Sequence, residues 1–187
     1  MGRIEGVAAV FMLETERLIL VQTPLEVLQA RLERDTFVAT VELPGGSMQV
    51  TFPAEWPGDA RDLFPGMIEQ HRDGEESNLW GGTVIEQRER VAVGQMGFKG
   101  LPADGVVEIG YGINPSYQNR GYATEMVTAL TEWALSQPTV DRVTAECRRD
   151  NVGSIRVLEK AGFERTGRRV DEEDGPVIVW QRVDQDG

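Results

Sequence analysis

One junction in the sequence carries residue types suited to binding an anion. Residues 117–126 read YQNRGYATEM and lie between a strand-like run ending in INP and the amphipathic run VTALTEWAL. Gly121 lets the backbone turn, or approach a ligand without a Cβ in the way, and Ala123 keeps a nearby position small. The first N–H groups of the next helix point into this loop, so a pyrophosphate would satisfy them. An ordinary capped turn is the alternative interpretation.

A carboxylate on the preceding strand-like run, residues 106–113 (VVEIGYGI), could transfer a proton. Strand alternation places Glu108 on one face together with Gly110 and Gly112, and it makes the other face apolar. The two glycines leave open space beside Glu108 for a ligand, and a positioned glutamate can take a proton from a reacting amine. An ion-paired or solvated edge residue is the alternative for Glu108.

The sequence lacks the motifs of several other enzyme classes. It has no G-x-x-x-x-G-K-[ST] run, and Gly110 and Gly112 are not followed by the third glycine of a dinucleotide fingerprint, which argues against nucleotide triphosphatases and hydride transfer. His71, the only histidine, lies in the polar run HRDGEES, a predicted turn, and Cys147 alternates with apolar neighbours as a core residue would. No Cys/His cluster has metal-ligand spacing, so we expect neither a covalent intermediate nor a metal.

Composition bounds the partners of the chain. Its 187 residues suit one domain, and a net charge of −12 argues against DNA and anionic membranes while being compatible with a cationic substrate. No apolar run approaches the roughly 20 residues that span a bilayer. A single cysteine excludes an intramolecular disulfide, which fits the cytoplasm. We expect residues 1–12 to be a loosely ordered leader and residues 13–187 to form the single domain.

Local signals predict the first elements that position these residues. Residues 16–22, ERLILVQ, predict a buried strand. Thr23 as N-cap, Pro24 at the first helical position and Glu26 three residues after the cap predict a helix to about Arg34.

The middle of the chain is expected to contain two hairpins and a helix. Residues 37–52 predict a hairpin or a mobile substrate loop, and residues 59–70 predict a helix that Pro65-Gly66 must kink or split. Residues 83–87 and 91–98 predict two antiparallel strands.

The last part of the chain again alternates strands and helices. Apolar residues spaced by three and four from Ala123 predict an amphipathic helix that ends before Pro138. A strand at 140–147, a helix at 152–161 and a final strand at 175–182 follow. The fold class is therefore mixed α/β, with one sheet and helices on its faces.

These motifs together resemble one enzyme superfamily. The run from Gln118 to Ala123 resembles the Q/R-x-x-G-x-G/A motif of the GNAT N-acetyltransferases, which holds the pyrophosphate of coenzyme A. The run VEIGYGINP before it resembles the family's fourth strand, and NVGSIRVLEKAGF, residues 151–163, resembles its Asn-containing helix and K-x-G-F turn. With the opening TERLIL, the resemblance covers about residues 14–182 and is closest to the ribosomal-protein N-terminal branch (RimJ/RimL-like). Residues 36–80 match weakly, and substrate choice is expected there.

The resemblance implies a fold and a co-substrate. The expected fold is a single α/β (α+β) GNAT-like domain with a central mixed, mostly antiparallel twisted sheet flanked by helices. Acetyl-CoA is the expected co-substrate, without a metal. Its pantetheine arm should follow the strand that ends at Ile113, with Asn151 nearby. The residues expected to bind its pyrophosphate are Gln118, Asn119, Arg120, Gly121, Tyr122, Ala123 and Thr124.

The resemblance also implies catalytic roles. Glu108 is the expected general base, because an α-amine with a pKa of about 7.7–8.0 must lose a proton before it attacks. Many family members carry a tyrosine as general acid where this chain has Leu158. Ser154, three residues after Asn151 on the same helix face, is the substitute candidate. Its alternatives are a hydrogen bond to the thiol or a purely structural role at the helix N-terminus.

The leading functional hypothesis is an acetyl-CoA-dependent N-acetyltransferase that transfers the acetyl group directly to a primary amine, with a protein or peptide α-amine as first choice. A small-molecule amine acetyltransferase (acting on a polyamine or aminoglycoside), a transferase of other acyl chains and a non-catalytic acyl-CoA-binding module are the alternatives. The expected partners are acetyl-CoA and the acceptor amine, with no DNA and no membrane. A homodimer is left open.

Overall fold

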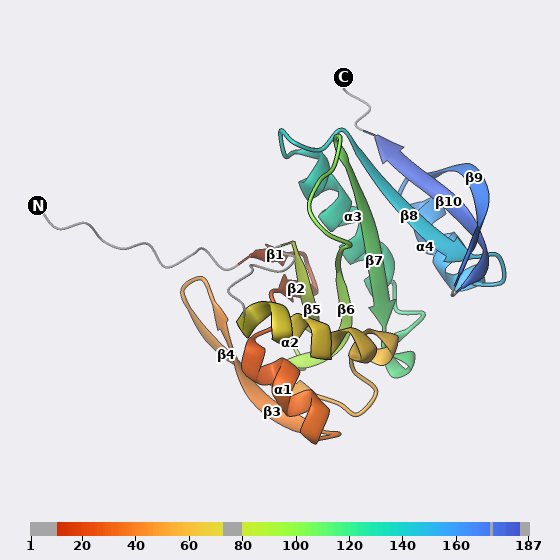
Figure 1. Cartoon of the computed structure of the whole chain (residues 1–187). Coiled ribbons are helices and arrows are strands. Elements are labelled where there is room, and N and C mark those ends of the chain that lie inside the picture. Colours follow the sequence, from red (N-terminus) through yellow and green to blue (C-terminus); the bar gives the residue numbers. More distant parts are fainter. Residues whose placement is uncertain (1–10, 73–79, 173, 184–187) are drawn as a thin grey trace, which may run out of the picture.

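One long twisted sheet organises the chain. The computed structural model describes residues 11–72, 80–172 and 174–183. Its main sheet has the strand order β1-β2-β5-β6-β7-β8-β10-β9, and β4 joins it through β6 (Figure 1). Neighbouring strands are antiparallel except for β7–β8 and β4–β6. The strands are β1 (Met12–Glu14), β2 (Leu18–Val21), β3 (Phe37–Leu43), β4 (Gly46–Phe52), β5 (Gly81–Glu86), β6 (Val91–Phe98), β7 (Val106–Ile113), β8 (Arg142–Arg148), β9 (Glu164–Asp171) and β10 (Gly175–Val183).

Helices cover the two faces of the sheet unequally. The helices are α1 (Leu25–Glu33), α2 (Phe64–Arg72), α3 (Tyr122–Leu135) and α4 (Val152–Lys160), with short 3₁₀ turns η1 (Gly58–Leu63) and η2 (Pro115–Tyr117). The cluster of buried side chains shared with α3 and α4 extends from β2 to β10. The cluster shared with α1 and α2 extends only from β2 to β6. Neither cluster includes the second face of β7, β8 and β10.

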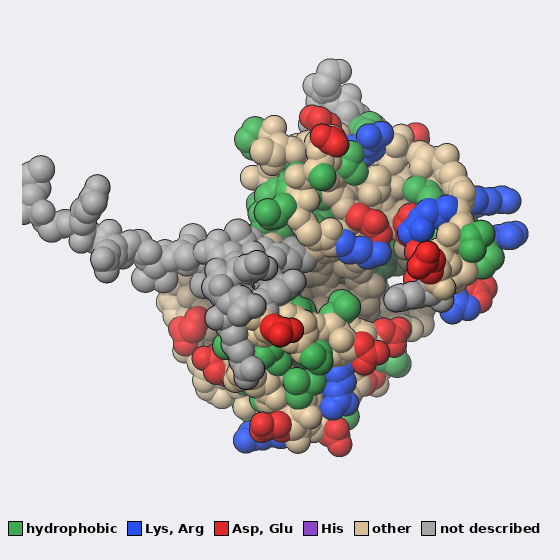
Figure 2. All heavy atoms as spheres, viewed as in Figure 1, with side chains coloured by type: hydrophobic (Ala, Val, Ile, Leu, Met, Phe, Trp, Pro, Cys, Tyr) green, Lys and Arg blue, Asp and Glu red, His purple; other side chains and the backbone are tan. Residues whose placement is uncertain are grey.

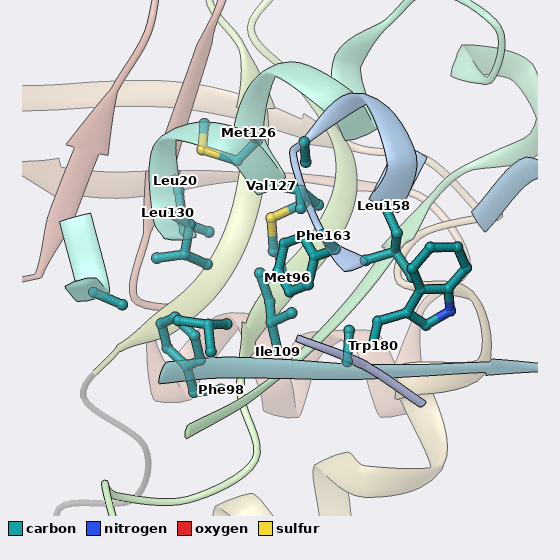
Figure 3. Close-up of a cluster of buried hydrophobic side chains, with 14 of the residues drawn as sticks. Leu20, Met96, Phe98, Ile109, Met126, Val127, Leu130, Leu158, Phe163 and Trp180 are labelled. Carbon is teal, nitrogen blue, oxygen red and sulfur yellow. The ribbon is translucent and has the colours of Figure 1, made fainter. Parts of the chain in front are cut away.

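The main core explains the apolar periodicity of α3. Met126, Val127 and Leu130 are fully buried and belong to one cluster with Leu158 of α4 and Trp180 of β10 (Figure 3). The predicted amphipathic helix is thereby confirmed, and it ends at Leu135, before Pro138.

Burial on both faces explains the continuous apolar run of β2. Leu18 and Leu20 belong to the α3/α4 cluster, whereas Ile19 and Val21 belong to the α1/α2 cluster. A strand buried on both faces needs apolar residues at every position. The predicted first strand is therefore confirmed, in the shorter form Leu18–Val21.

The predicted fold class is confirmed, and most of the predicted elements are found. Residues 37–52 form the β3–β4 hairpin rather than a mobile loop, and β5 and β6 form the predicted antiparallel pair. The predicted helix at residues 59–70 is split, because η1 ends at Leu63 and α2 begins at Phe64, directly before Pro65.

The predicted capping box at the start of α1 is wrong. The N-cap is Pro24, without a side-chain hydrogen bond. Thr23 is buried instead, and its hydroxyl lies 2.9 Å from that of Thr83 and accepts a hydrogen bond from Gln95. A buried hydroxyl group needs a partner, and here the strands supply one that the local sequence does not reveal.

Strand β9 was not predicted at all. Its sequence, ERTGRRVD, has no apolar alternation, because all but the last of its residues are exposed and it pairs only with β10 at the edge of the sheet.

Strand β1 was missed because its first residue was counted with the predicted leader, residues 1–12. Residues 1–10 of the predicted leader lie outside the described residues, but Met12 begins β1 and the ring of Phe11 packs edge-on against Trp133.

The residues around His71 were predicted as a turn. The structure places the backbone of His71 in α2, and residues 73–79 lie outside the described residues.

The burial of α3 predicts a stability effect. Leu130→Ala should lower the free energy of unfolding by about 2–5 kcal/mol, because it leaves a cavity between α3 and the sheet. Urea denaturation monitored by circular dichroism measures this change. Leu32→Ala is the matched control on α1, where the residue is 41% exposed, and it should cost less than about 0.5 kcal/mol. Equal losses in the two variants would contradict the assignment of the core.

Candidate active site

The separation of two parallel strands creates the candidate site. β7 and β8 pair only where Val106–Ile109 lies beside Arg142–Ala145, although β7 continues to Ile113 and β8 to Arg148. Beyond the paired segment the strands diverge (Figure 1), and a cavity of about 590 Å³ lies between them. The space-filling view is hollowed here, with acidic and basic side chains around the hollow (Figure 2).

The cavity is lined from both faces of the sheet. Lys99 and Glu146 come from the face that α1 and α2 leave uncovered, and Tyr111 and Ser154 come from the face covered by α3 and α4. A ligand in the cavity would therefore have charged groups on one side and hydroxyl groups on the other.

The predicted anion cradle lies at the end of β7. Asn119 and Gly121 have left-handed backbone conformations, with φ of 61° and 83°, and α3 begins at the next residue, Tyr122. The backbone N–H groups of residues 119–124 have no hydrogen-bond acceptor within the described part of the chain. Gly121 is the N-cap and provides no side-chain cap, so the alternative of an ordinary capped turn loses its support. The row of free donors suits a pyrophosphate.

The side chains of this loop have structural roles. Gln118 donates to the carbonyl of Ile113 at 2.9 Å, which ties the loop to the end of β7. Arg120 donates to the carbonyl of Ser116 and lies over the ring of Tyr117. The ring of Tyr122 is buried in the main core, and Ala123 and Thr124 are half-buried. A ligand of the cradle would thus contact mainly backbone.

Arg17, from the N-terminal segment, binds the cradle loop and the first turn of α3, and this role was not predicted from the sequence. Arg17 forms an ion pair with Glu125 in the first turn of α3, with Nε to Oε2 at 2.7 Å. Its Nη1 donates to the carbonyl of Arg120 at 2.9 Å, and its guanidinium lies over the ring of Tyr122. Thr15 also donates to Glu125. The run TERLIL was read as a strand and as part of the family resemblance, but Arg17 received no role because its partners lie more than 100 positions away.

These contacts control the charge of Glu125. Burial raises the pKa of this carboxyl. The hydrogen bonds from Thr15 and Arg17 lower the pKa by more than burial raises it, so the net pKa lies below the ordinary value. A negative charge so close to the cradle would repel an anion, and Arg17 neutralises it.

The expected open space beside Glu108 is partly filled. A Cβ built on Gly110 would lie 3.6 Å from Cε of Lys99, whereas one built on Gly112 would meet nothing within 4 Å. Nζ of Lys99 lies 2.6 Å from Oε1 of Glu108. Gly110 lines the cavity, and the side chain of Lys99, the residue after β6, lies within van der Waals distance of that position. The ion-paired alternative describes Glu108 in this structure.

The start of α4 brings hydroxyl groups together. Oδ1 of Asn151 accepts a hydrogen bond from the backbone N–H of Ser154 and so caps the helix. Oγ of Ser154 lies 2.7 Å from the hydroxyl of Tyr111. Leu158, at the position of the family's tyrosine, is fully buried and cannot reach the cavity.

Tyr111 was expected to be only a buried apolar residue. Its ring is half-buried against the main core, but its hydroxyl reaches the cavity. Burial raises the pKa of Tyr111 to about 12, so the phenol keeps its proton throughout the neutral range. The signal for this residue in the sequence was a tyrosine on the same strand as the candidate base Glu108.

A second carboxylate was also missed. Glu146 lines the cavity, its side chain is 15% exposed, and both of its oxygens accept hydrogen bonds from Arg169 of β9 at 2.6 Å. Cys147 is buried as predicted, and its sulfur accepts a hydrogen bond from the indole of Trp180. The lining contains four acidic side chains and two basic ones, namely Asp59, Glu146, Asp150, Asp174, Lys99 and Arg148.

Comparison with known proteins gives the family. The family model for the GNAT acetyltransferase domain matches residues 31–164. The chain belongs to the GNAT acetyltransferases. It is accordingly an N-acetyltransferase that uses acetyl-CoA as co-substrate.

Individual GNAT relatives are similar over different lengths. The N-acetyltransferase YjdG of Bacillus subtilis (strain 168) is 36% identical over 114 residues, which cover 58% of this chain and 67% of that protein. An aminoglycoside N(6')-acetyltransferase type 1 of Klebsiella pneumoniae is 38% identical over 72 residues, 38% of this chain and 35% of the enzyme. The structure of the ribosomal-protein-S5-alanine acetyltransferase of Vibrio fischeri has a TM-score of 0.63 at 14% identity, covering 94% and 98% of the two chains. At this identity the likeness concerns the fold.

Two further properties of the GNAT domain can be stated for the described residues. They contain no group of three or more His, Cys, Asp or Glu side chains that could hold a metal ion. None of the helices in this part of the chain has the length and apolar character needed to cross a membrane.

The contacts of Arg17 predict a selective loss of co-substrate binding. Arg17→Gln should raise KM for acetyl-CoA about 10-fold, a low-end value for lost hydrogen bonds to a charged group at a half-exposed side chain. Acetyl-pantetheine has no pyrophosphate, so its kcat/KM should stay close to the parent value. Steady-state kinetics with both donors measures the difference.

Arg182→Gln is the matched control for Arg17→Gln. Arg182 also pairs with a glutamate of α3 and donates to a backbone carbonyl, but its partner Glu132 lies near the C-terminal end of the helix. Equal effects of the two variants, or equal losses with both donors, would show that Arg17 acts only through general stability.

Proposed function

We propose that this GNAT domain, residues 13–187, transfers the acetyl group directly to a primary amine that enters from the open face of the sheet. One observation carries the proposal. The divergence of β7 and β8 opens a cavity with carboxylates on one face and hydroxyl groups on the other. Deprotonation of the amine and protonation of the thiolate can therefore take place on opposite sides of the same thioester.

The residues that would hold acetyl-CoA follow from the same geometry. The N–H groups of residues 119–124 would receive the pyrophosphate. The pantetheine arm would run along the edge of β7 that faces β8, because this edge has no strand partner beyond Ile109. Asn151 lines the cavity at the start of α4 and lies near this path.

Two carboxylates compete for the role of base. Glu108 lies on β7 outside the cavity lining and is paired with Lys99, which lines it, whereas Glu146 of β8 lines the cavity itself and is held by two hydrogen bonds from Arg169. We assign the proton transfer to Glu108, because its cationic partner is a single exposed lysine that contacts one oxygen, whereas Arg169 occupies both oxygens of Glu146. Glu146 then attracts the ammonium form of the acceptor into the cavity.

Ser154 and Tyr111 form the proton-donating side. Serine alone is a weak acid, but its hydroxyl is 2.7 Å from the phenol of Tyr111, which is protonated at neutral pH. The pair can donate a hydrogen bond to the leaving thiolate and so replaces the tyrosine that other members carry on the helix.

The division of roles between the carboxylates is testable by kinetics. Glu108→Gln keeps the volume but cannot accept a proton, so kcat should fall about 10²–10⁴-fold while binding of acetyl-CoA stays unchanged. Glu146→Gln should mainly raise KM for the acceptor. Initial rates at saturating acetyl-CoA separate the two cases. A large loss of kcat in Glu146→Gln with normal turnover in Glu108→Gln would transfer the role of base to Glu146.

The acceptor proposed first is the α-amine of a protein or peptide. One structural neighbour is named for a ribosomal protein, and an α-amine needs less help with deprotonation than a lysine. The second candidate is a small polycationic amine. It is favoured by the excess of acidic side chains around the cavity and by the relative named for aminoglycosides.

A further part of the proposal is a cytoplasmic location. The single, buried, unpaired cysteine fits a reducing compartment. The net charge of −12 favours partners that are not nucleic acids.

The choice of acceptor is tested by a thiol-release assay with acetyl-CoA. Short basic peptides with a free N-terminus should support turnover, and the same peptides blocked at the N-terminus should not. Polyamines and aminoglycosides form the second arm of the assay. Activity confined to these small amines would establish the second candidate, and equal turnover of blocked, lysine-containing peptides would exclude an α-amine preference.

A further inference from the structure

Lysine is rare in this chain, and one of its lysines lies in the candidate active site. Of 19 basic residues only Lys99 and Lys160 are lysines, and the others are arginines. Lys160 ends α4 and does not line the cavity. Lys99 directly follows β6 and does line it. The two residues therefore form a natural pair for comparing amine chemistry within one molecule.

The position of Lys99 is fixed by its backbone and by its aliphatic chain. Its backbone N–H donates to the carbonyl of Glu108 at 2.8 Å, and its side chain extends over Gly110. The amine then reaches Oε1 of Glu108 at 2.6 Å. The side chain is 63% exposed and lies at the open side of the cavity.

These contacts place a primary amine beside a carboxylate at the site where the acetyl thioester is proposed to bind. Tyr111 and Ser154, the proposed proton donors, line the same cavity. An amine held near a base and a bound thioester reacts as an intramolecular partner, which raises its effective concentration strongly.

We propose that Lys99 is an acetyl acceptor of the protein's own active site. Glu108 takes a proton from the ammonium group, and Nζ then forms a bond to the acetyl carbonyl carbon. The carbon–sulfur bond of acetyl-CoA breaks, the thiolate is protonated from the Ser154 side, and the attacking nitrogen loses its second proton to solvent. The products are acetyl-Lys99, coenzyme A and one proton. The inference rests on the proposed site for acetyl-CoA.

The modification would change the electrostatics of the cavity. Acetylation removes one of its two cations and releases Glu108 from its ion pair. The remaining charged lining is dominated by Glu146 and the aspartates, so the acetylated protein should bind a cationic acceptor more tightly. Lys99 would thus become acetylated, and the cavity more acidic, whenever acetyl-CoA is present without an external amine.

The test uses the full chain, acetyl-CoA and no acceptor. Trypsin cuts after Lys99 only when that residue is unmodified. Acetylation therefore converts the two fragments 91–99 and 100–120 into one fragment, 91–120, which mass spectrometry detects. We expect this fragment to accumulate at least about 10 times faster than acetylation of Lys160, as expected for a positioned amine. The rate constant should not depend on protein concentration, because the reaction occurs within one molecule.

Two controls separate enzymatic from chemical acetylation. Gly121→Val places a β-branched side chain at a φ of 83° in the cradle, where the first atom would already lie 3.3 Å from Arg17. This variant should lose the preference for Lys99. Excess coenzyme A without an acetyl group should suppress modification of Lys99 in the parent protein and leave modification of Lys160 unchanged. This second control does not depend on whether the Gly121→Val variant folds.

The outcomes are distinct. Equal rates at Lys99 and Lys160, a Lys99 rate that persists under excess coenzyme A, or a rate constant that rises with protein concentration would each overturn the inference. If Lys99 stays unmodified while an external amine is acetylated, only this inference fails. If neither is acetylated, the proposed function fails as well.

Discussion

The parting of β7 and β8 is the constraint on which the site depends. Two parallel strands that stayed paired along their whole length would seal the sheet, and no side chain of one face could act together with one of the other. Because pairing ends after Ile109 and Ala145, backbone edges and side chains from both faces meet in one cavity. The N–H donors at the start of α3 lie just after the end of β7, on the side that we propose for the co-substrate.

This opening is stable because both strands are held on their outer sides. β7 is paired with β6 along Gly94–Phe98, and β8 is paired with β10 along its whole length. The buried stripes of α3 and α4 fix the distance from one side, through residues such as Met126 and Leu158. Neither buried cluster covers the other side of β7 and β8, which is the side that we propose for the approach of the acceptor.

The sequence was sufficient for those features that depend on local chemistry. The glycine and small residues at the end of β7 and the alternation that puts Glu108 opposite the core both follow from neighbours within a few positions. The partners of the charged groups did not follow. Lys99 reaches Glu108, Arg17 reaches Glu125 and Tyr111 reaches Ser154 through strand register and helix packing, which no local pattern encodes. β9 escaped for a related reason, since an exposed edge strand has no core face to impose a period.

The segment by which the family is recognised is shorter than the unit that makes the site. Residues 31–164 contain every motif of the cradle and the helix after β8, yet Arg17 lies before this segment and Arg169 lies after it. These two arginines hold the carboxylates of Glu125 and Glu146, one beside the proposed co-substrate site and one beside the proposed acceptor site. A protein that shared only the recognisable segment would keep the signature and lose the charge balance of both binding sites. Exchange of domains between relatives therefore has to carry both flanks, β1 and β2 as well as β9 and β10, to transplant an active enzyme.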